Sequence, residues 1–532
     1  MVTTNRNILL PVILLGITLS VLLIVARSRE ATPTRATSPT ANQPSPASST
    51  SPDPNLARQI DRLIDESGLP QARWGVVVKS LADGQLLYSR DSNKLFTPAS
   101  NMKIYTTAVA LDLLGADYRW RTSVYAGQQV DASGTLDGDL ILYGRGAPDL
   151  DSFKKDGLPA LAAQLYEQGL RRVRGNIIGD ESYFRGELFG LGWQWNDLQW
   201  YFGAEPSALS VDQNSIALKI APATKPGIAP ALTLDHEADY LRLTNNTMTV
   251  ARGEATTIGI NRGLSDSELR VWGDFPAGGR PFSAYLSVPN PALWAATLFK
   301  QALAARGIKV EGEPRSRDFR MPEKDKFDPQ KAVETAHLES ETLGEIVHRT
   351  NKERNNLYAE LILRTLGKER GATAPDPDPR KNRERGDDEA GLAVIKLWLS
   401  QHQISTEGLG LRDGCGLSRL DLVTPDATAS LLEAIAKTNS ASTFHDSLPV
   451  AGRDGTLSAR LHREAGRIYA KTGSLTYDHS LSGYATTENG QVLVFAIFCN
   501  DATAKADPVH VIDQIAALLT AAGAAQPAKT RE

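Results

Sequence analysis

Two short motifs that lie far apart in the chain must be brought together by the fold, and they constrain it more than any other feature. Ser100 and Lys103 stand in the segment Thr97-Pro98-Ala99-Ser100-Asn101-Met102-Lys103, and Lys471-Thr472-Gly473-Ser474 lies far downstream. A serine three residues before a lysine places both side chains on one face of a helix, within contact distance. A serine hydroxyl becomes nucleophilic beside a base, and a lysine kept neutral by burial or by other cations can be that base.

The context of each motif predicts the element on which it lies. Pro98 precedes the serine, and the apolar spacing from Ile104 to Leu114 predicts a helix, so Ser100 is expected at a helix N-terminus, where backbone N–H groups favour developing negative charge. The segment from Arg467 to Gly473 is predicted to be a strand, and the apolar runs around Glu488-Asn489-Gly490 predict a hairpin. Lys471 is therefore expected on a strand that leads into an antiparallel meander.

Charge and the N-terminal segment limit the class of protein. A net charge of −4 gives no electrostatic footprint for nucleic acid. Residues 8–26 carry no charge and follow Arg6, which suits a membrane span better than a signal-peptide core. We therefore expect a signal anchor or, less favoured, a cleaved signal peptide over residues 1–30, and a disordered Ser/Thr/Pro linker over residues 31–54. The protein is expected to be exported, in the periplasm or at the outer face of the cytoplasmic membrane, anchored by residues 8–26.

The pattern of apolar and turn-forming residues changes between the two motifs. Residues 117–287 contain short apolar runs and Gly/Asp turns, which predict a β-rich insertion, whereas helical patterns precede and follow them. The pattern predicts an α/β (α+β) fold in which residues 55–116 and 288–525 form two halves of one domain. One or more accessory domains are then expected within the insertion.

Three further features were weighed against plainer interpretations. Cys415 and Cys499 form a disulfide or are two buried thiols, and the sequence leaves this open. Asp235-His236-Glu237 has no usual ligand spacing, so a surface turn is preferred to a metal site, and no metal or cofactor is expected. The aromatic group formed by Trp193, Trp195, Trp200 and Tyr201 predicts a local core, or packing between subdomains, rather than a surface for stacking sugars.

Ser-x-x-Lys with Lys-Thr-Gly is the signature of serine acyl-enzymes, and the chain resembles the class C low-molecular-mass penicillin-binding proteins. These are D-alanyl-D-alanine carboxypeptidase/endopeptidases of the DacB type. The resemblance covers roughly Asn55 to Leu519. Besides the two motifs it is carried, in order, by Gly203-Ala-Glu-Pro-Ser-Ala-Leu-Ser, Asn356-Leu-Tyr-Ala-Glu, Asp413-Gly-Cys-Gly-Leu-Ser-Arg, Leu448-Pro-Val-Ala-Gly-Arg-Asp-Gly-Thr-Leu and Ser480-Leu-Ser-Gly-Tyr.

The resemblance implies a transpeptidase-like domain with an antiparallel sheet flanked by helices. It also implies a serine peptidase that acts on peptidoglycan stem peptides and is trapped by β-lactams. Ser100 would attack the carbonyl of the penultimate D-Ala, and Lys103 would accept its proton. The other implied contacts are Asn356 with the substrate amide, Lys471 and Thr472 with the terminal carboxylate, and the N–H groups of Ser100 and Ser474 with the oxyanion. Gly473 is implied as a further substrate-binding residue.

One position departs from the pattern of the family. The middle motif of the family is Ser-x-Asn, whereas this chain has Arg354-Asn355-Asn356. An arginine stays protonated and cannot relay a proton. As a third cation it could lower the pKa of Lys103 and help it act as a base, or it could displace Lys103 or obstruct the substrate.

Three functions remain open at this stage. The first is an active serine peptidase that cleaves free ends, cross-links or both. The second is a weakened or inactive homologue that binds the cell wall as a scaffold. The third is a β-lactamase, which is less favoured because the long insertion and the ordered segments go with the peptidases and no deacylating glutamate can be identified. The sequence leaves the oligomeric state open.

Overall fold

The computed structural model describes residues 54–522, except 237–239, 265, 323–324, 375–383 and 504–505. The expected anchor at residues 8–26 lies outside the described residues, as does the expected linker apart from Pro54, the first residue of α1. Within the described residues, no helix combines the length and the apolar character that crossing a membrane requires.

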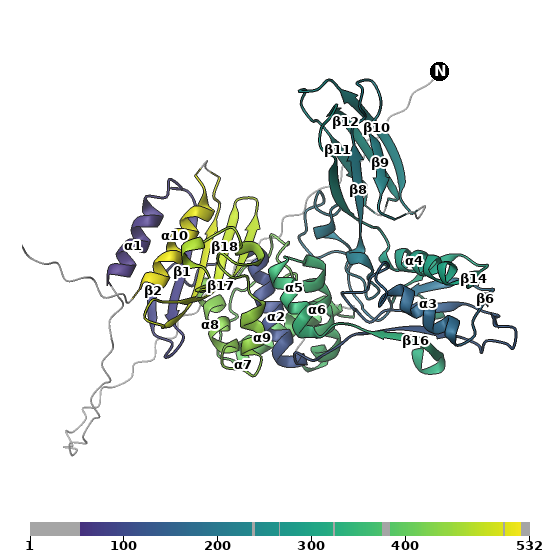
Figure 1. The fold of residues 1–532 in the computed structure, drawn as a ribbon. Coiled ribbons are helices and arrows are strands. Elements are labelled where there is room, and N and C mark those ends of the chain that lie inside the picture. The colour runs from purple at the N-terminus through teal and green to yellow at the C-terminus, as the bar shows by residue number, and fades with distance from the viewer. Residues whose placement is uncertain are drawn as a thin grey trace, which may run out of the picture. The chain divides into compact units, whose positions relative to one another are not determined.

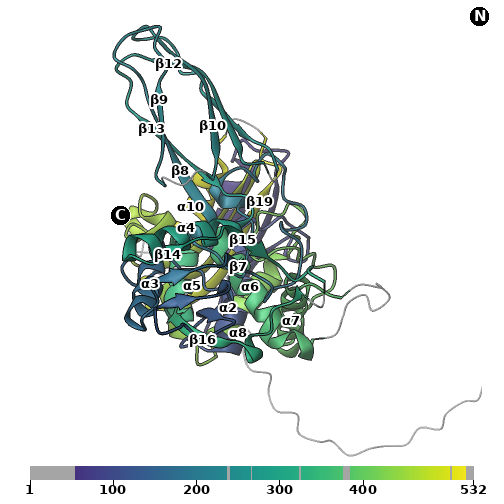
Figure 2. The same cartoon turned by 90° about the vertical axis from the view of Figure 1, so that its right-hand side faces the viewer.

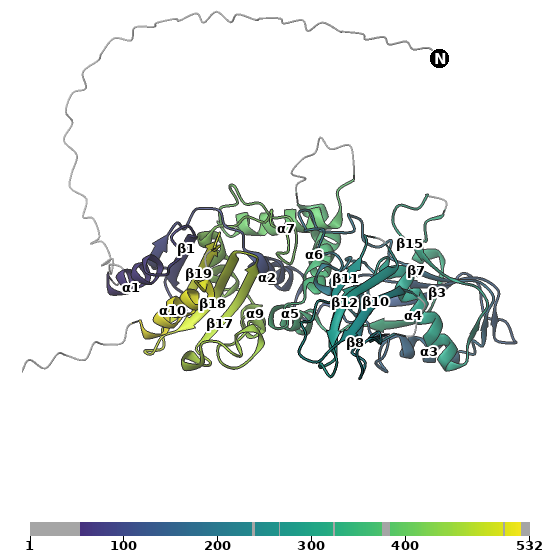
Figure 3. The same ribbon diagram turned by 90° about the horizontal axis from the view of Figure 1, so that it is seen from above.

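A five-stranded antiparallel sheet in the order β17-β18-β19-β1-β2 joins the two ends of the chain (Figure 1). Figure 3 shows this sheet between α10 on one side and α2 on the other. The expected antiparallel sheet flanked by helices is confirmed. The bounds of these elements are α1 Pro54–Asp65, β1 Arg73–Ser80, β2 Leu86–Arg90, β17 Ile468–Leu475, β18 Asp478–Thr486, β19 Val492–Asn500 and α10 Pro508–Ala521.

Alternation of side chains along β19 explains why the sheet is covered on both faces. Successive residues of a strand point to opposite faces. Leu493, Phe495 and Ile497 pack into the core beneath α1 and α10, whereas Val494 and Ala496 pack into the core that contains α2. The strand is therefore apolar at nearly every position. β17, which carries Lys471, lies at the edge of this sheet and pairs with β18.

The helices on the other face of the sheet surround α2, which is buried over most of its length. Trp398 on α7 donates from Nε1 to Asp112 near the end of α2, at 2.8 Å. Thr342 and Glu345 form a capping box that starts α5. The bounds of these helices are α2 Met102–Leu114, α5 Leu343–Lys352, α6 Asn356–Arg370, α7 Asp387–Gln401, α8 Pro425–Ile435 and α9 Ala441–Ser447.

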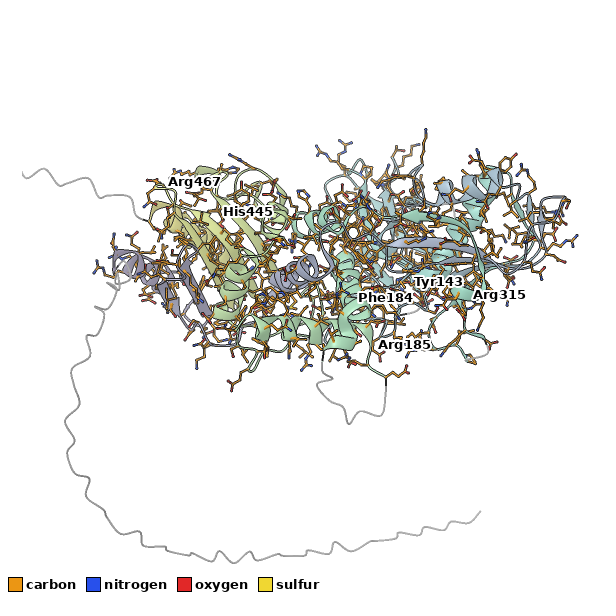
Figure 4. The ribbon with its side chains drawn as sticks, turned by 90° about the horizontal axis from the view of Figure 1, so that it is seen from below. Tyr143, Phe184, Arg185, Arg315, His445 and Arg467 are labelled. Carbon is orange, nitrogen blue, oxygen red and sulfur yellow. The ribbon has the colours of Figure 1, made fainter. Side chains whose placement is uncertain are left out.

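The insertion is built on a second five-stranded sheet in the order β15-β7-β5-β3-β16. Residues of α3 and α4 share one core with this sheet. On the sheet, Tyr143, labelled in Figure 4, packs with Tyr125 and Phe327. The bounds are β3 Arg121–Ala126, β5 Leu140–Tyr143, α3 Leu158–Glu167, β7 Ile177–Asp180, α4 Pro291–Arg306, β15 Pro314–Arg317 and β16 Val333–Glu339.

Shorter sheets complete the insertion, and Figure 2 shows β8, β9, β10, β12 and β13 running side by side. Their orders are β10-β12-β11, β13-β8-β9 and β14-β6-β4. The bounds are β4 Thr135–Leu136, β6 Arg172–Val173, β8 Ser215–Ala221, β9 Ala231–Leu234, β10 Arg242–Val250, β11 Gly259–Arg262, β12 Glu268–Pro276, β13 Phe282–Ser287 and β14 Lys309–Val310.

The expected boundary between residues 287 and 288 is wrong. Trp294 and Phe299 of α4 pack in the core of the insertion, and β16 pairs with β3 so that Glu339 lies opposite Arg121. The insertion therefore closes near Glu339, and the second half of the peptidase domain begins at α5. Local apolar patterns do not reveal this, because the pairing joins strands that are distant in the sequence.

Cys415 and Cys499 are both free and buried. Cys499 lies on β19 and faces the core beneath α1 and α10, whereas Cys415 lies in the loop after α7 and packs with Ala359 and Leu417. The two residues are therefore buried thiols in separate cores.

His236 is 6% exposed, so the expected surface turn is wrong for this residue; Glu237 lies outside the described residues. Its Nδ1 lies 2.9 Å from Asp235 Oδ1 and its Nε2 lies 3.0 Å from Asp212 Oδ2. Burial alone would lower the pKa of His236, but hydrogen bonds to both carboxylates outweigh it and raise the pKa to about 9. A charged imidazole between two carboxylates thus ties the end of β9 to the turn at Asp212.

We expect the His236→Gln variant to lose stability in a way that depends on pH. The pKa of His236 rises from 6.5 to about 9 on folding, so the ion pairs stabilise the protein fully below pH 6.5 and are lost as the pH rises toward 9. The difference in free energy of unfolding between wild type and variant should be on the order of 3 kcal/mol at pH 6 and should shrink above pH 9. Urea unfolding followed by fluorescence measures it, since Trp294 lies 4.9 Å from the imidazole ring.

The exposed His348 on α5 provides the control. His348→Gln should change the stability little at any pH. An equal loss of stability for His236→Gln at pH 6 and pH 10 would contradict the ion-pair assignment.

Candidate active site

Ser100 lies in the 3-10 turn Ala99–Asn101, directly before α2, and is 8% exposed. Ala99 has a φ of +48°, which a residue with a Cβ rarely adopts and which the surroundings must hold in place. Three hydrogen bonds hold the turn against β18 and β19: Asn101 Nδ2 donates to Ser482 Oγ (2.8 Å), Ser480 Oγ donates to the carbonyl of Pro98 (2.7 Å) and the N–H of Thr97 donates to Asn500 Oδ1 (2.7 Å). The nucleophile is thus fixed by the sheet.

The amine of Lys103 contacts three oxygen atoms. Its Nζ lies 3.2 Å from Ser100 Oγ, 2.7 Å from Asn356 Oδ1 and 2.7 Å from the carbonyl of Cys415. The last two can only accept hydrogen bonds. A neutral amine has two N–H groups and one lone pair, so it donates to these two acceptors and turns its lone pair toward the hydroxyl of Ser100. This is the geometry that a general base requires.

The surroundings of Lys103 favour its neutral form. The side chain is fully buried, and burial lowers the pKa of Lys103. The acidic groups of Cys415, Asp413 and Glu360 oppose this shift, while the charge of Arg354 adds to it.

Lys471 forms the facing wall on β17, where it is fully buried and donates to the carbonyl of Thr472 at 3.1 Å. Gly473 explains how closely this strand approaches the nucleophile. A Cβ at Gly473 would lie 2.5 Å from the carbonyl oxygen of Pro98 and 2.2 Å from Ser480 Oγ. The fold therefore brings the two sequence motifs into direct contact.

The residues around Lys471 complete this wall. Thr472 Oγ1 hydrogen-bonds Thr456 Oγ1 at 2.8 Å, and Ser474 is exposed. Burial, Lys103 and Arg354 together hold the pKa of Lys471 well below its usual range. The contacts predicted for Thr472, Gly473 and Ser474 with a substrate stay predictions.

Asn356 is the first residue of α6, whose N-cap Asn355 accepts a hydrogen bond from the N–H of Tyr358. Asn356 Oδ1 accepts from Lys103, and its Nδ2 donates to the carbonyl of Phe202 at 2.9 Å. Asn356 thus links the base to the insertion. Its predicted hydrogen bond to a substrate amide stays a prediction.

Arg354 lies between α5 and α6 with a φ of +64° and is exposed. It makes no hydrogen bond or ion pair with the residues that the structure describes. Its charge lowers the pKa of both Lys103 and Lys471. Because Lys103 keeps its contact with Ser100, Arg354 has not displaced the base.

Sequence reasoning missed the loop from Asp413 to Ser418, which supplies the Cys415 carbonyl to Lys103. The only signal was that this segment carries the family resemblance. A second missed contributor is Trp193, whose Nε1 donates to Asp413 Oδ2 at 2.9 Å. Trp193 thus packs against the active-site loop, whereas Trp195 is 76% exposed. The predicted packing between subdomains is therefore confirmed for Trp193, and Trp195 belongs to none of the cores that the described residues form.

Among the described residues, Glu360, Asp413 and Cys415 place possible metal-ligand atoms within 4.8 Å of one another. Both oxygens of Asp413 already accept hydrogen bonds from backbone or indole N–H groups. The cluster therefore does not present an open set of ligand atoms, and the chemistry of the site comes from Ser100 and the two lysines.

These contacts form the arrangement that a serine enzyme with a lysine general base requires, on an antiparallel sheet flanked by helices. The family model of the D-Ala-D-Ala carboxypeptidase 3 (S13) family matches residues 56–522. The chain therefore belongs to this family, and the resemblance inferred from the sequence is confirmed.

Known relatives agree with this assignment. The D-alanyl-D-alanine carboxypeptidase of Actinomadura sp. (strain R39) is 34% identical over 477 residues, which cover 87% of this chain and 84% of that protein. The crystal structure of penicillin binding protein 4 (dacB) from Haemophilus influenzae has a TM-score of 0.73 at 25% identity and covers 86% of this chain and 98% of its own. A second structure of it, complexed with a β-lactam, has a TM-score of 0.67 at 23% identity and covers 87% and 98%.

We expect Gly416→Ala to destabilise the active-site loop. Gly416 has a φ of +81°, and a Cβ there would lie 1.8 Å from the carbonyl oxygen of Ala99. The substitution strains the backbone and separates the loop from the nucleophile turn, so urea unfolding should show a loss of roughly 2–4 kcal/mol. Gly127→Ala is the control, because a Cβ at Gly127 meets nothing within 4 Å. Equal stabilities of the two variants would show that the loop does not pack as described.

Proposed function

We propose that this protein is a serine-type D-Ala-D-Ala carboxypeptidase/endopeptidase that cleaves peptidoglycan stem peptides or cross-links through an acyl-enzyme and binds penicillin. The observation that carries the proposal is the 3.2 Å contact between Lys103 Nζ and Ser100 Oγ, in a buried site that favours the neutral amine. Membership of the family, whose model is described as a D-Ala-D-Ala carboxypeptidase, supports the substrate class.

Acylation follows from this geometry. Ser100 Oγ attacks the carbonyl carbon of the penultimate D-Ala while its proton passes to Lys103. The N–H groups of Ser100 and Ser474 stabilise the oxyanion, a contribution of about 3 kcal/mol in related chemistry. The C–N bond then breaks, and the protonated Lys103 returns its proton to the leaving amine. Water attacks the ester, and its proton restores the hydroxyl of Ser100 as the shortened peptide leaves.

Lys471 and Thr472 are proposed to bind the carboxylate of the leaving residue. In the free enzyme burial, Lys103 and Arg354 together hold the pKa of Lys471 well below its usual range. An arriving carboxylate favours the ammonium form instead. Substrate binding therefore charges Lys471 at the moment when a counter-ion is present, which avoids a buried unpaired cation in the free site.

Penicillin binding is supported by the H. influenzae relative, which was solved in complex with a β-lactam. A β-lactam carbonyl presented to Ser100 would be attacked in the same way as the peptide carbonyl. The ester would then be held in the same pocket.

We also propose that the protein is exported and held at the outer face of the cytoplasmic membrane by residues 8–26. The uncharged run after Arg6 and the Ser/Thr/Pro-rich residues 31–54 support this, since together they form an anchor and a tether. A peptidoglycan substrate is consistent with that location.

A weakened homologue that binds the wall is the second candidate, and Arg354 favours it. The family places a serine at this position, and an arginine supplies no hydroxyl between the two lysines. A β-lactamase is less well supported, because the family match extends over residues 56–522, including the insertion.

Labelling with a fluorescent penicillin tests the acyl-enzyme. We expect the wild type to be labelled and Ser100→Ala to be unlabelled, because the ester forms on that hydroxyl. Ser405→Ala, at an exposed position, should be labelled like the wild type. With purified muropeptides the wild type should release D-Ala or open cross-links. A wild type that stays unlabelled at saturating probe would contradict the proposal and favour the scaffold.

We expect Arg354→Ser to raise the rate of acylation at least about tenfold, since general acid–base groups typically contribute a factor of 10²–10⁴. In the family pattern the hydroxyl at this position lies between the two lysines, and the new serine is expected to pass a proton to the leaving amine in the same way. Arg354→Lys is the matched control, which keeps a cation and should acylate at nearly the rate of the wild type. The measurement is the second-order rate constant for fluorescent penicillin. A slower Arg354→Ser enzyme would instead show that Arg354 is an adapted catalytic group.

A further inference from the structure

Three buried carboxyl side chains lie in or beside the loop from Asp413 to Ser418, whose Cys415 carbonyl accepts from Lys103. They belong to Glu360, Asp413 and Asp421. None of them takes part in the steps described above. We propose that these three residues are positioning residues for the base: they hold the carbonyl of Cys415 against the amine of Lys103, and the charge on Glu360 sets the range of pH over which Ser100 is acylated. The proposal rests on the proposed acyl-enzyme function.

Asp413 organises the loop. Its carboxylate accepts four N–H groups: those of Cys415 (3.1 Å) and Gly416 (2.6 Å) on Oδ1, and those of Ser418 (2.7 Å) and the Trp193 indole (2.9 Å) on Oδ2. A carboxylate accepts in all these directions, whereas an asparagine would turn an N–H toward one pair of donors. The peptide unit of Cys415 is therefore oriented by a side chain that cannot be replaced by its amide.

Glu360 fixes the loop from the other side. Its Oε1 accepts the N–H of Gly414 at 2.8 Å, and Thr106 Oγ1 donates to the carbonyl of the same residue at 2.8 Å. Glu360 lies one turn after Asn356 on α6, and Thr106 lies one turn after Lys103 on α2. The two helices that carry Lys103 and Asn356 thus both hold the loop that carries the third contact. Any shift of the loop would move the Cys415 carbonyl away from Nζ.

The three carboxyl groups do not all carry a charge. Burial and the neighbouring Asp413 raise the pKa of Asp421 well above its usual range. Asp421 Oδ2 is buried and accepts no hydrogen bond from the residues that the structure describes. A buried carboxyl oxygen that accepts no hydrogen bond and lies beside a second carboxylate favours the protonated form of its carboxyl group. Asp421 is therefore neutral and able to donate to Asp413.

Glu360 changes its charge near neutral pH. Burial, with the charge of Asp413, raises the pKa of Glu360 to about 7, against the opposing effect of Arg364. The groups that act on Lys103 from the packed elements are Cys415, Asp413 and Glu360, which raise its pKa, and Arg354, which lowers it. Lys471 also faces Lys103, but its own pKa is held well below its usual range. An ionised Glu360 favours the ammonium form of Lys103, which cannot act as a base. A protonated Glu360 favours the free amine.

Glu360→Gln in the full-length protein tests this. The side chain keeps its shape, and its Oε1 can still accept from Gly414, so the fold should be retained. The second-order rate of labelling by fluorescent penicillin is measured from pH 5 to pH 10. Acylation rises with pH as Lys103 loses its proton, and without the Glu360 charge this rise should move to lower pH by about 1 unit. The plateau rate should change less than threefold. A residue with a merely structural role would lower the plateau rate and leave unchanged the pH at which acylation rises.

Two controls accompany the variant. Glu181, in the insertion, also has a pKa raised by burial to about 7 but lies beside Ser207 and Arg320, so Glu181→Gln should leave the pH profile unchanged. Asp421→Asn replaces a protonated carboxyl by a neutral amide that can still donate to Asp413, so it should match the wild type. Asp413→Asn should lower the plateau at least about 100-fold because it disorders the contacts of Cys415.

An unchanged pH profile in Glu360→Gln, or the same shift in Glu181→Gln, would overturn the proposal. An Asp421→Asn enzyme with a shifted profile would overturn the assignment of the proton to Asp421. If the wild type is not labelled, the acyl-enzyme function itself is refuted. This outcome is distinct from an unchanged pH profile in Glu360→Gln or a shifted one in Asp421→Asn, which both require a wild type that is labelled.

Discussion

The buried amine of Lys103 is the interaction on which the rest of the site depends. Burial lowers the pKa of Lys103 and disfavours the charged ammonium group, so the fold must supply the amine with hydrogen-bond partners. It does so with oxygen atoms from the nucleophile turn, from α6 and from the loop at Cys415. These three elements come from distant parts of the sequence, and each is fixed by its own contacts to the sheet or to α2. The contacts of this one amine therefore join both halves of the domain around α2.

The insertion takes part in the same arrangement. Its segment from Trp193 to Phe202 reaches the site, where the Trp193 indole donates to Asp413 and the Phe202 carbonyl accepts from Asn356. Asp413 orients the loop whose Cys415 carbonyl accepts from Lys103, and Asn356 accepts from Lys103 directly. The insertion thus supports the base through two hydrogen bonds, in addition to forming its own cores. A change in its position would be transmitted to the catalytic amine.

The sequence predicted those features that depend on local pattern. The apolar run of β19 and the serine-lysine spacing before α2 carry their own signal, because burial on both faces gives a continuous apolar run and helical geometry brings residues three apart onto one face. The boundary at residue 288 was wrong because β16 pairs with β3 across the whole insertion. The contact of Lys103 with the Cys415 carbonyl was missed because every residue has a backbone carbonyl, so no residue type marks this acceptor in the sequence. The buried His236 was taken for a turn because its partner Asp212 is distant in the sequence.

Arg354 can be understood within the same balance of charge. A hydroxyl between the lysines would relay a proton to the leaving amine, and this chain has none at that position. The remaining donor is Lys103 itself after it has taken the proton of Ser100. The charge of Arg354 lowers the pKa of Lys103, which makes the protonated lysine a stronger acid. The acids around Cys415 act in the opposite direction and keep the amine basic enough to accept the first proton. In the proposed mechanism, the two sets of charges would therefore suit a single lysine to both proton transfers.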